Sequence, residues 1–392
     1  MRPFQDPRAP SGLTPGVILD LVRSGRAGTR SDLRRLTGLS RTAVTARVSA
    51  LVSGGLLSTG EELASTGGRP PEALSLNAEA GVVLAVALGR SRSQVGVFDL
   101  LGNELRADSR DHEVGSGPDQ VMPEVVARAR DQLARTTAPL LAIGLSLPGT
   151  VDEVRGMSID SPVVPGWDGV ELQPWFADLT DAPLVVGNDA DVLAQSELLG
   201  RGRALRDVLV VKASTGLGLG VISDGRIVKG HLGAAGEIGH VKVEAARGLS
   251  CRCGSEGCLE AVAAGWALVA GAQSPDIGHV RDLVAAAVSG NPEARGLLRT
   301  SGRLQGEVLA VAIHLLNPQA IVVGGDMAAA FDIVAAGMRE SVYARASALS
   351  TRDLQFLPAA YGDRAGLVGC AALALDAVLS PGAVDARLAR QN

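Results

Sequence analysis

From about residue 80 onward the sequence alternates apolar runs with helical stretches, and this alternation is the feature that most restricts its fold. Runs such as GVVLAVAL (81–88), LLAIGLSLPGTVD (140–152) and AIVVGGDMAAA (320–330) predict buried strands. Further strands are expected within 93–105, which also holds a hairpin turn, 182–200 and 207–225. Strands that alternate with helices are typical of an α/β domain. A chain of 392 residues is long enough for two or three domains.

Charge is distributed unevenly along the chain. Residues 1–80 contain 10 Arg and no Lys and carry +3, whereas the remainder carries −8. A basic head on an acidic body suits a nucleic-acid module fused to another domain. The overall 46% hydrophobic and 20% charged residues are those of an ordinary globular protein. No apolar run approaches the roughly 20 residues of a membrane span, and residues 1–12 lack the apolar core of a signal peptide. We therefore expect a cytoplasmic protein with no membrane partner.

The basic head has the pattern of three short helices. The first is predicted over 15–24, and the second starts after Ser31, which we take as its N-cap. Gly38 supplies a tight turn, and Ser40 then caps a third helix. The buried face of that helix is predicted to hold Val44, Val48 and Leu51. Two strands, 56–59 and 73–76, follow as a hairpin, which completes the pattern of a winged helix-turn-helix.

The other face of the third helix is short and polar, as a helix in the major groove of DNA requires. Its members are Arg41, Thr42, Thr45 and Ser49. Arg69 lies in the Gly- and Pro-bounded loop 67–71 of the hairpin, from which it is expected to reach the minor groove. A three-helix packing module without a nucleic-acid role has similar spacing. The basic balance and the polar face favour DNA binding.

Asn188 and Asp189 follow an apolar strand in the body, at the end of the strand where open α/β sheets place ligands. An amide beside a carboxylate can bind two neighbouring hydroxyls, and the carboxylate can also accept a proton. The alternative is structural, because Asp189 stands where a helix N-cap would be. The dipeptide alone leaves both interpretations open.

Cys251, Cys253 and Cys258 lie within eight residues, a spacing that favours metal ligation over disulfides in a reducing cytosol. His240 upstream would complete a tetrahedral zinc site, with Gly254 and Gly257 letting the loop fold around the ion. The fourth ligand stays open at this point, since four other histidines are present. They are His112, His231, His279 and His314.

A glycine-rich bend over 214–220 is a candidate phosphate loop. Thr215 offers a hydroxyl, and Gly216 and Gly218 would let backbone N–H groups approach a phosphate. Tight hairpins and close packing produce the same composition.

These motifs together resemble the ROK family of sugar kinases and sugar-sensing repressors, over about residues 14 to 380. The most specific part is GEIGH (236–240) followed by CRCGSEGCLE (251–260). The resemblance implies a winged helix-turn-helix over 1–78 and, over 79–392, a two-lobed actin-like ATPase (ribonuclease-H-like) sugar-kinase fold with a zinc knuckle at 240–258. The implied sugar ligands are Asn188, Asp189, Glu237, His240 and Glu260, and the implied zinc ligands are His240, Cys251, Cys253 and Cys258. In kinase members the residue matching Asp189 is the catalytic base.

One departure separates this chain from the kinases of the family. Their first phosphate loop has the form DxGGT, whereas here Ala87 replaces the Asp and Arg90 replaces the second Gly. Phosphoryl transfer depends on neutralising and positioning phosphates, so losing the carboxylate damages the nucleotide half of the site. We therefore expect a repressor, a homodimer or dimer of dimers on operator DNA, that responds to a sugar or sugar phosphate. The alternative is an ATP-dependent hexose kinase, with Asp189 as its base, that carries an accessory head.

Overall fold

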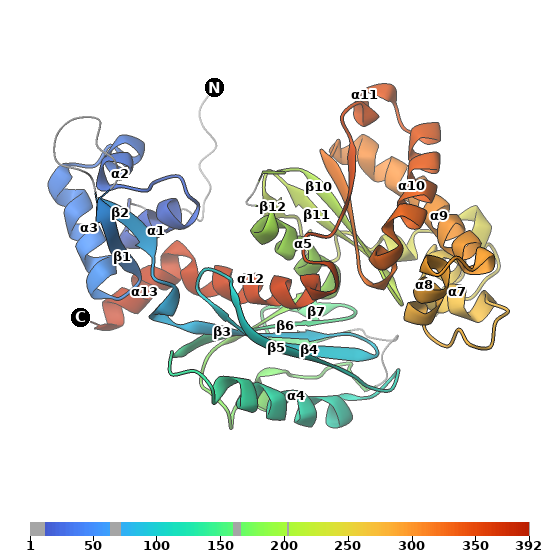
Figure 1. Ribbon diagram of the computed structural model, residues 1–392, viewed down its shortest axis with the longest axis horizontal. Helices are drawn as coiled ribbons and strands as arrows, with labels where there is room; N and C mark the ends of the chain where they lie inside the picture. Colours follow the sequence, from blue (N-terminus) through green and yellow to red (C-terminus); the bar gives the residue numbers. More distant parts are fainter. Residues whose placement is uncertain (1–11, 63–71, 160–165, 202–203, 392) are drawn as a thin grey trace.

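The computed structural model describes residues 12–62, 72–159, 166–201 and 204–391. Figure 1 shows a small head built from the first helices and a hairpin, followed by two larger lobes, each organised on one sheet. This arrangement confirms the predicted α/β class with a helical head.

The head consists of three helices and a two-stranded wing. They are α1 (Pro15–Arg23), α2 (Arg30–Thr37), α3 (Arg41–Ser53), β1 (Leu57–Glu62) and β2 (Glu72–Leu76). The predicted cap of the third helix is confirmed, because Ser40 Oγ accepts from the Ala43 amide at 3.2 Å. Gly38 adopts φ 70°, the left-handed turn expected of it.

The predicted cap of the second helix is wrong. The cap of α2 lies two residues earlier, at Thr29: its Oγ1 accepts from the Asp32 amide at 3.1 Å. The Thr29 hydroxyl also donates to Asp32 Oδ2 at 2.8 Å. This reciprocal arrangement needs a hydrogen-bond acceptor at the third helical position. For Thr29 that position holds Asp32.

The first lobe holds a five-stranded sheet in the order β5-β4-β3-β6-β9. Its strands are β3 (Val82–Leu88), β4 (Arg92–Asp99), β5 (Glu104–Asp111), β6 (Leu140–Leu147) and β9 (Leu184–Asn188). The pairs among β3, β4 and β5 are antiparallel, which confirms the predicted hairpin, and β6 and β9 join in parallel. Helix α4 (Pro118–Leu133) covers one face and α12 (Ala365–Leu379) the other (Figure 1). A small hairpin, β7 (Val151–Asp152) and β8 (Met157–Ser158), lies beyond β6.

The second lobe repeats this topology. Its sheet runs β12-β11-β10-β13-β14, with three antiparallel strands followed by two parallel ones. The strands are β10 (Val208–Ala213), β11 (Leu217–Ser223), β12 (Arg226–Ile227), β13 (Ala320–Gly324) and β14 (Gln355–Pro358). The accompanying helices are α6 (Glu260–Ala263), α7 (Gly265–Gly271), α8 (Val280–Val288), α9 (Pro292–Leu316), α10 (Phe331–Arg345) and α11 (Ala348–Thr351). Two sheets with the same strand topology are characteristic of the expected actin-like, ribonuclease-H-like fold.

Two helices join the lobes. Helix α5 (Asp189–Gly200) packs on the second sheet, and α12 packs on the first. The two helices touch closely, since a Cβ at Gly369 would lie 1.9 Å from the carbonyl oxygen of Val192. Because α5 begins where β9 ends, the residues at that junction are placed between the two sheets.

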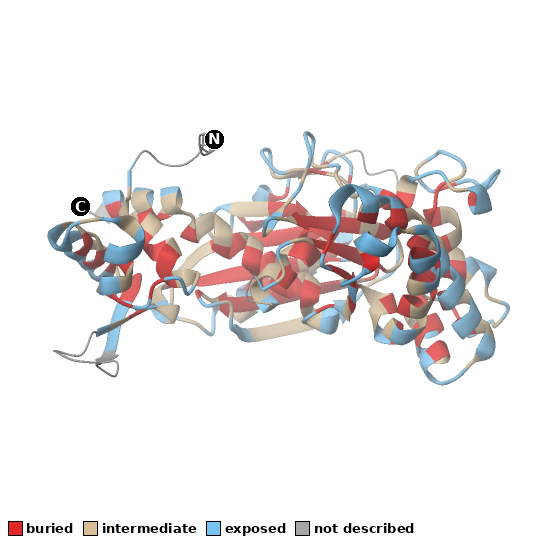
Figure 2. Cartoon of the chain, turned by 90° about the horizontal axis from the view of Figure 1, so that it is seen from above, coloured by how far each residue is buried: buried red, intermediate tan, exposed pale blue. Residues whose placement is uncertain are grey.

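The last helix, α13 (Pro381–Gln391), returns to the head and packs on α1. Gly16 allows the approach, because a Cβ there would lie 2.1 Å from the carbonyl oxygen of Pro381, and its amide donates to Asp385 Oδ1 at 2.8 Å. Val384 and Leu388 share one hydrophobic core with the head and α12. Buried residues therefore run without a break from the head into the first lobe (Figure 2).

Within the described residues, no single helix has the length and apolar character needed to cross a membrane; a bent pair, Gly362–Leu379 with Pro381–Arg390, meets the length and composition test only when taken together.

Candidate functional site

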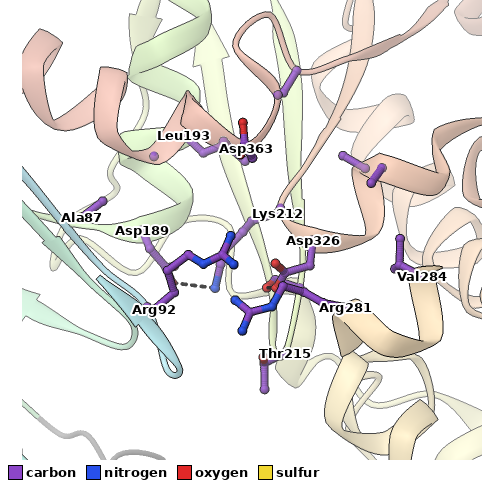
Figure 3. A pocket seen from close by; sticks show the side chains of 18 of the residues that line it. Ala87, Arg92, Asp189, Leu193, Lys212, Thr215, Arg281, Val284, Asp326 and Asp363 are labelled. Carbon is purple, nitrogen blue, oxygen red and sulfur yellow. Dashed lines mark hydrogen bonds and ion pairs between the residues drawn. The ribbon is translucent and has the colours of Figure 1, made fainter. Parts of the chain in front are cut away.

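A cavity of about 850 Å³ lies between the two lobes. Figure 3 shows side chains of both lobes converging on it, among them Arg92 from β4, Asp189 from α5, Lys212 from β10 and Arg281 from α8. Apolar side chains also line it, among them Leu193, Val284 and Val288. The cavity therefore combines an apolar wall with a cluster of charged groups, as ligand sites do.

Asn188 and Asp189 divide the two roles that the sequence left open. Asn188 is the N-cap of α5: its Oδ1 accepts from the Ala190 amide at 2.8 Å, and its Nδ2 donates to the Gly149 carbonyl at 2.8 Å. The interpretation of Asp189 as the cap is therefore wrong, because the residue before it caps the helix. The carboxylate of Asp189 faces the cavity and lies 2.5 Å from Nζ of Lys212.

The other expected sugar ligands lie in the same region. Glu237 precedes the short helix η3 (Ile238–His240) and His240 ends it, with Glu237 Oε2 at 3.7 Å from His240 Nε2. Glu260 opens α6, and its carboxylate accepts from the Leu217 amide at 3.0 Å and from Trp266 Nε1 at 3.2 Å.

The charge environment of Glu237 shows how near these carboxylates are to one another. Burial raises the pKa of Glu237; the charge of His240 opposes the shift, and those of Asp189 and Glu260 add to it. Three carboxylates that act on one another in a partly dry site are suited to accepting hydrogen bonds from the hydroxyls of a polyol.

The cysteine cluster has the donors and spacing of a metal site. The ligand atoms of His240, Cys251, Cys253 and Cys258 all lie within 4.8 Å of one another. The Cys253 and Cys258 sulfurs are 3.8 Å apart, and Cys251 Sγ is 3.9 Å from His240 Nδ1. Donors at the corners of a zinc tetrahedron stand about 3.8 Å apart, so the set fits this ion. Among the five histidines, His240 is the one within the cluster.

Local backbone conformation lets the cluster close. Gly254 and Gly257 adopt φ of 81° and 78°, in the left-handed region that disfavours other residues. Lys242 Nζ donates to Cys258 Sγ at 3.0 Å, which holds the side chain of this cysteine from outside the cluster. His240 presents Nδ1 to the cysteines and Nε2 to Glu237, so one imidazole joins the cluster to the carboxylates of the cleft.

The glycine-rich bend contains two positions at which glycine allows close packing. Thr215 lines the cavity, but a Cβ at Gly216 would lie 3.1 Å from Glu260 Oε2, and one at Gly218 would lie 2.9 Å from the Ala190 Cβ. These two glycines thus let β11 approach Glu260 and α5. Ala87 and Arg90, at the positions that the family resemblance matches to the Asp and second Gly of the kinase loop, both line the cavity.

In the head, the polar face of α3 is solvent-exposed as predicted. Arg41, Thr42, Thr45 and Ser49 are all exposed, whereas Val44, Val48 and Leu51 are buried. Arg47 differs, since its guanidinium turns back to the Ala43 carbonyl at 2.9 Å. Arg69, the predicted minor-groove residue, lies outside the described residues.

Several cleft residues were missed by the sequence analysis. Lys212 is one, although a single charge within the apolar run VLVVKA was a usable signal. The others join the lobes in space: Ser91 Oγ lies 2.9 Å from His279 Nε2, and Asp111 lies 3.3 Å from Arg281. The two residues of each pair are 188 and 170 residues apart in sequence, so no local sequence pattern predicts these contacts.

Comparison with known proteins places this geometry in a family. The model of the ROK family matches residues 83–377. The chain belongs to the ROK family. The xylose repressor of Bacillus subtilis (strain 168) is 24% identical over 365 residues, which are 92% of this chain and 94% of the repressor.

Solved ROK structures differ in how much of this chain they match. A ROK family transcriptional regulator described as a homolog of the E. coli MLC protein superposes with TM-score 0.78 at 25% identity, covering 96% of this chain and 98% of its own. A ROK glucokinase from Streptomyces griseus, solved with glucose and AMPPNP, gives TM-score 0.65 at 28% identity, covering 74% of this chain and 98% of its own. The regulator therefore matches nearly the whole chain, whereas the complete kinase leaves about a quarter of it unmatched.

Proposed function

We propose that this chain is a sugar-responsive transcriptional regulator, a repressor that binds operator DNA through the head and a sugar or sugar derivative in the cleft. Two features of the same chain support the proposal. The polar face of α3 is exposed, and Asp189, the carboxylate expected to act as the base in a kinase, forms an ion pair with Lys212 in the cleft. The full-length similarity to a xylose repressor and to a ROK transcriptional regulator supports it.

In this proposal the sugar is bound by hydroxyl contacts to Asn188, Asp189, Glu237, His240 and Glu260. Asp189 lines the cavity, and the charges of Asp189, His240 and Glu260 act on Glu237, which supports this role for these four. The solved glucokinase relative binds glucose and AMPPNP, so the body of this fold accommodates a hexose. The loss of the loop carboxylate at Ala87 leaves the nucleotide half without its usual charge.

A structural zinc is proposed at His240, Cys251, Cys253 and Cys258. Bound there, the ion would fix the loop and orient the His240 ring, whose Nε2 faces Glu237. The metal would thus act on sugar binding through geometry rather than through chemistry on the sugar.

DNA binding is assigned to the head, 1–78, with Arg41, Thr42, Thr45 and Ser49 in the major groove and Arg69 in the minor groove. The body, 79–392, is the sugar-binding domain. A homodimer, or a dimer of dimers, would place two α3 helices about one DNA turn apart on a pseudo-palindrome.

Sugar binding would release DNA by changing lobe closure. A ligand shifts this equilibrium only as far as it binds the two conformations with different affinity. Helices α5 and α12 join the lobes, and α12 continues into the core that holds the head. Closure of the lobes around a sugar would therefore move α12 and change the spacing of the two heads in the dimer.

A fluorescence-anisotropy titration tests the proposal. Operator fragments are selected from random duplex DNA by the full-length protein, and their affinity is measured with and without each of a panel of hexoses, pentoses and their phosphates. We expect at least one ligand to weaken operator binding at least about tenfold. If no DNA sequence is selected, or if no ligand changes operator affinity, the proposed sugar-responsive regulator is contradicted.

The rival function is a hexose kinase with an accessory head. A coupled ATPase assay over the same sugars decides it, because robust turnover would mean that Ala87 and Arg90 do not disable the nucleotide half. We expect none above background, since Lys212 occupies the carboxylate that such an enzyme uses.

A further inference from the structure

A second cavity, of about 190 Å³, lies where the head meets the first lobe, and we refer to it as the junction cavity. It is separate from the cleft between the lobes, because the two cavities share no lining residue. Its walls come from α1 and β2 of the head, from the turn between β4 and β5, and from the helices α5 and α12. The space is smaller than the roughly 300–1,000 Å³ of drug-sized pockets, so it suits a small organic molecule. A molecule bound there would touch the head and the body at once.

The junction cavity has an apolar wall that is already in place. The turn between β4 and β5 is fixed by Asp99, whose Oδ1 accepts from the Leu101 and Asn103 amides at 2.8 and 2.9 Å. Gly102 in this turn has φ 84° and brings the turn close to α5, since a Cβ there would lie 3.0 Å from Leu199 Cδ2. Leucines from all the contributing segments line the space, namely Leu76, Leu100, Leu101, Leu198, Leu199 and Leu375.

The charged groups that line the junction cavity do not balance. Asp20 and Asp376 supply two carboxylates, and Arg23 supplies one guanidinium. Arg23 follows Asp20 by three residues on α1, a spacing at which opposite charges on a helix can pair. Its Nη2 instead lies 2.5 Å from Asp376 Oδ1 on α12. Within the described residues the partly buried Asp20 forms no ion pair, so one negative charge is left without a counter-charge beside the leucines.

Asp376 is already engaged, which leaves Asp20 as the carboxylate available to a ligand. Oδ1 of Asp376 accepts from Arg23, and its Oδ2 accepts from Gln195 Nε2. A ligand that complements one free carboxylate and a leucine wall has a single positive charge on a short apolar body. An ammonium group meets the first requirement, because it carries three N–H donors and forms charge-assisted hydrogen bonds with a carboxylate. Burial of the apolar body against the leucines adds to the affinity.

We propose that the junction cavity binds a small primary amine, with its ammonium group on Asp20 and its apolar body among the leucines, and that the bound amine holds the head against the first lobe. A ligand that touches both parts binds most tightly when they are packed together as here. It therefore stabilises that packing in proportion to its occupancy. The junction cavity would thus be a second effector site, independent of the sugar site in the cleft.

Saturation-transfer NMR titrations of the full-length protein at pH 7, in a buffer without amines, test the site. The probes share one branched apolar body and differ in charge: 3-methylbutylamine, 3-methylbutanol and 4-methylpentanoate. We expect the amine to bind with a Kd of about 0.1–1 mM, and the alcohol and the carboxylate to bind at least about tenfold more weakly. Asp20→Asn should weaken the amine at least about tenfold and leave it close to the alcohol. Leu101→Ser, at a half-exposed position of the wall, should weaken the amine and the alcohol alike, by about threefold.

Asp119→Asn is the matched control. It makes the same change of charge at an exposed position at the start of α4, outside the junction cavity, so amine affinity should not change. Thermal melting of each variant without ligand establishes that the fold is intact. Hydrogen–deuterium exchange of residues 15–24 measures the second part of the proposal. The amine should slow exchange of these amides in the wild type and in Asp119→Asn, and should not slow it in Asp20→Asn.

Three results would overturn the inference. If none of the probes binds, or if all three bind equally, the junction cavity does not select an amine. If the amine binds as well to Asp20→Asn as to the wild type, it occupies another acidic site on the protein. If it binds through Asp20 but leaves exchange of residues 15–24 unchanged, it does not hold the head. Sugar binding in the cleft is measured separately, so the proposed function stands or falls independently of these results.

Discussion

Lys212 Nζ lies 2.5 Å from Oδ2 of Asp189, so the residue that the family resemblance predicts to match the catalytic base of ROK kinases is held here in an ion pair. The two side chains are only 20% and 17% exposed, which shields the pair from solvent. In the proposed function, a sugar hydroxyl would share Asp189 with an ammonium group. The pair keeps a hydrogen-bond acceptor in the cleft and places a cation directly beside it.

Removing Asp189 is expected to affect both stability and ligand binding. Asp189→Asn leaves Lys212 partly buried without its counter-charge, which should lower the free energy of unfolding by about 1–3 kcal/mol. Sugar affinity should fall at least about tenfold in calorimetry. Lys229→Met serves as the comparison, since Lys229 pairs with Glu153 at a more exposed position and should change stability by less than about 1 kcal/mol. Equal losses in both variants would contradict the special role of the cleft pair.

Loss of one knuckle thiol is expected to release metal and weaken sugar binding together. Cys253→Ser removes one of four donors, so zinc content measured by mass spectrometry should fall from about one ion per chain to well below it. Sugar affinity should fall because His240 is no longer fixed opposite Glu237. Operator binding without sugar should persist. Cys370, buried in α12 outside the cluster, provides the control: Cys370→Ala should retain the metal. Full zinc content in Cys253→Ser would rule out this ligand set.

Substitutions on α3 are expected to weaken operator binding without altering the cleft. Arg41→Ala should lower affinity and, if the contact is to phosphate, reduce the salt slope by about one. Thr45→Ala should weaken binding by about 1–3 kcal/mol where it meets a base edge. Anisotropy over a series of salt concentrations measures both quantities. Arg247→Ala removes a cation far from the head and should leave the salt slope unchanged. An equal decrease in this variant would show that the slope depends on the net charge of the protein and not on a contact made by Arg41.

Asp376 joins the head to α5, the helix that starts at Asp189 in the cleft. Its Oδ1 accepts from Arg23 of α1 at 2.5 Å, and its Oδ2 accepts from Gln195 of α5. We expect Asp376→Ala to keep sugar binding and basal operator binding, while the factor by which sugar changes operator affinity falls toward one. Asp224→Ala breaks an exposed pair with Arg206 in the second lobe and should keep the full factor. An undiminished factor in Asp376→Ala would remove this residue from the coupling.

Local patterns were sufficient to predict much of this molecule. The apolar runs gave the principal strands, because a buried strand needs a continuous apolar stretch. The knuckle was predictable because its three cysteines are neighbours in sequence, and the exposed face of α3 followed from helical spacing. The cap of α2 failed because Thr29 and Ser31 are both hydroxyl residues, and only the position of Asp32 distinguishes them.

Contacts between distant segments escaped sequence reasoning. The partner of Lys212 is a residue on a different element, and Asp376 meets Arg23 across 353 residues. The return of α13 to the head depends on Gly16, whose role is visible only where Pro381 lies against it. Gly216 and Gly218 have the composition of a phosphate loop, but they allow packing against Glu260 and Ala190.

Asp191, in the first turn of α5, is expected to make stability depend on pH. Burial raises its pKa to about 7; Lys229 opposes the shift, and Glu153, Asp189 and Glu237 add to it. Between pH 4 and 7 the folded chain therefore holds a proton that the unfolded chain has lost, so this group makes stability fall as pH rises and level off above 7. Asp191→Asn has no proton to lose. Urea unfolding should show it equal to the wild type near pH 4 and more stable by about 2–4 kcal/mol at pH 8. A difference that is the same at both pH values would show that Asp191 does not titrate in this way.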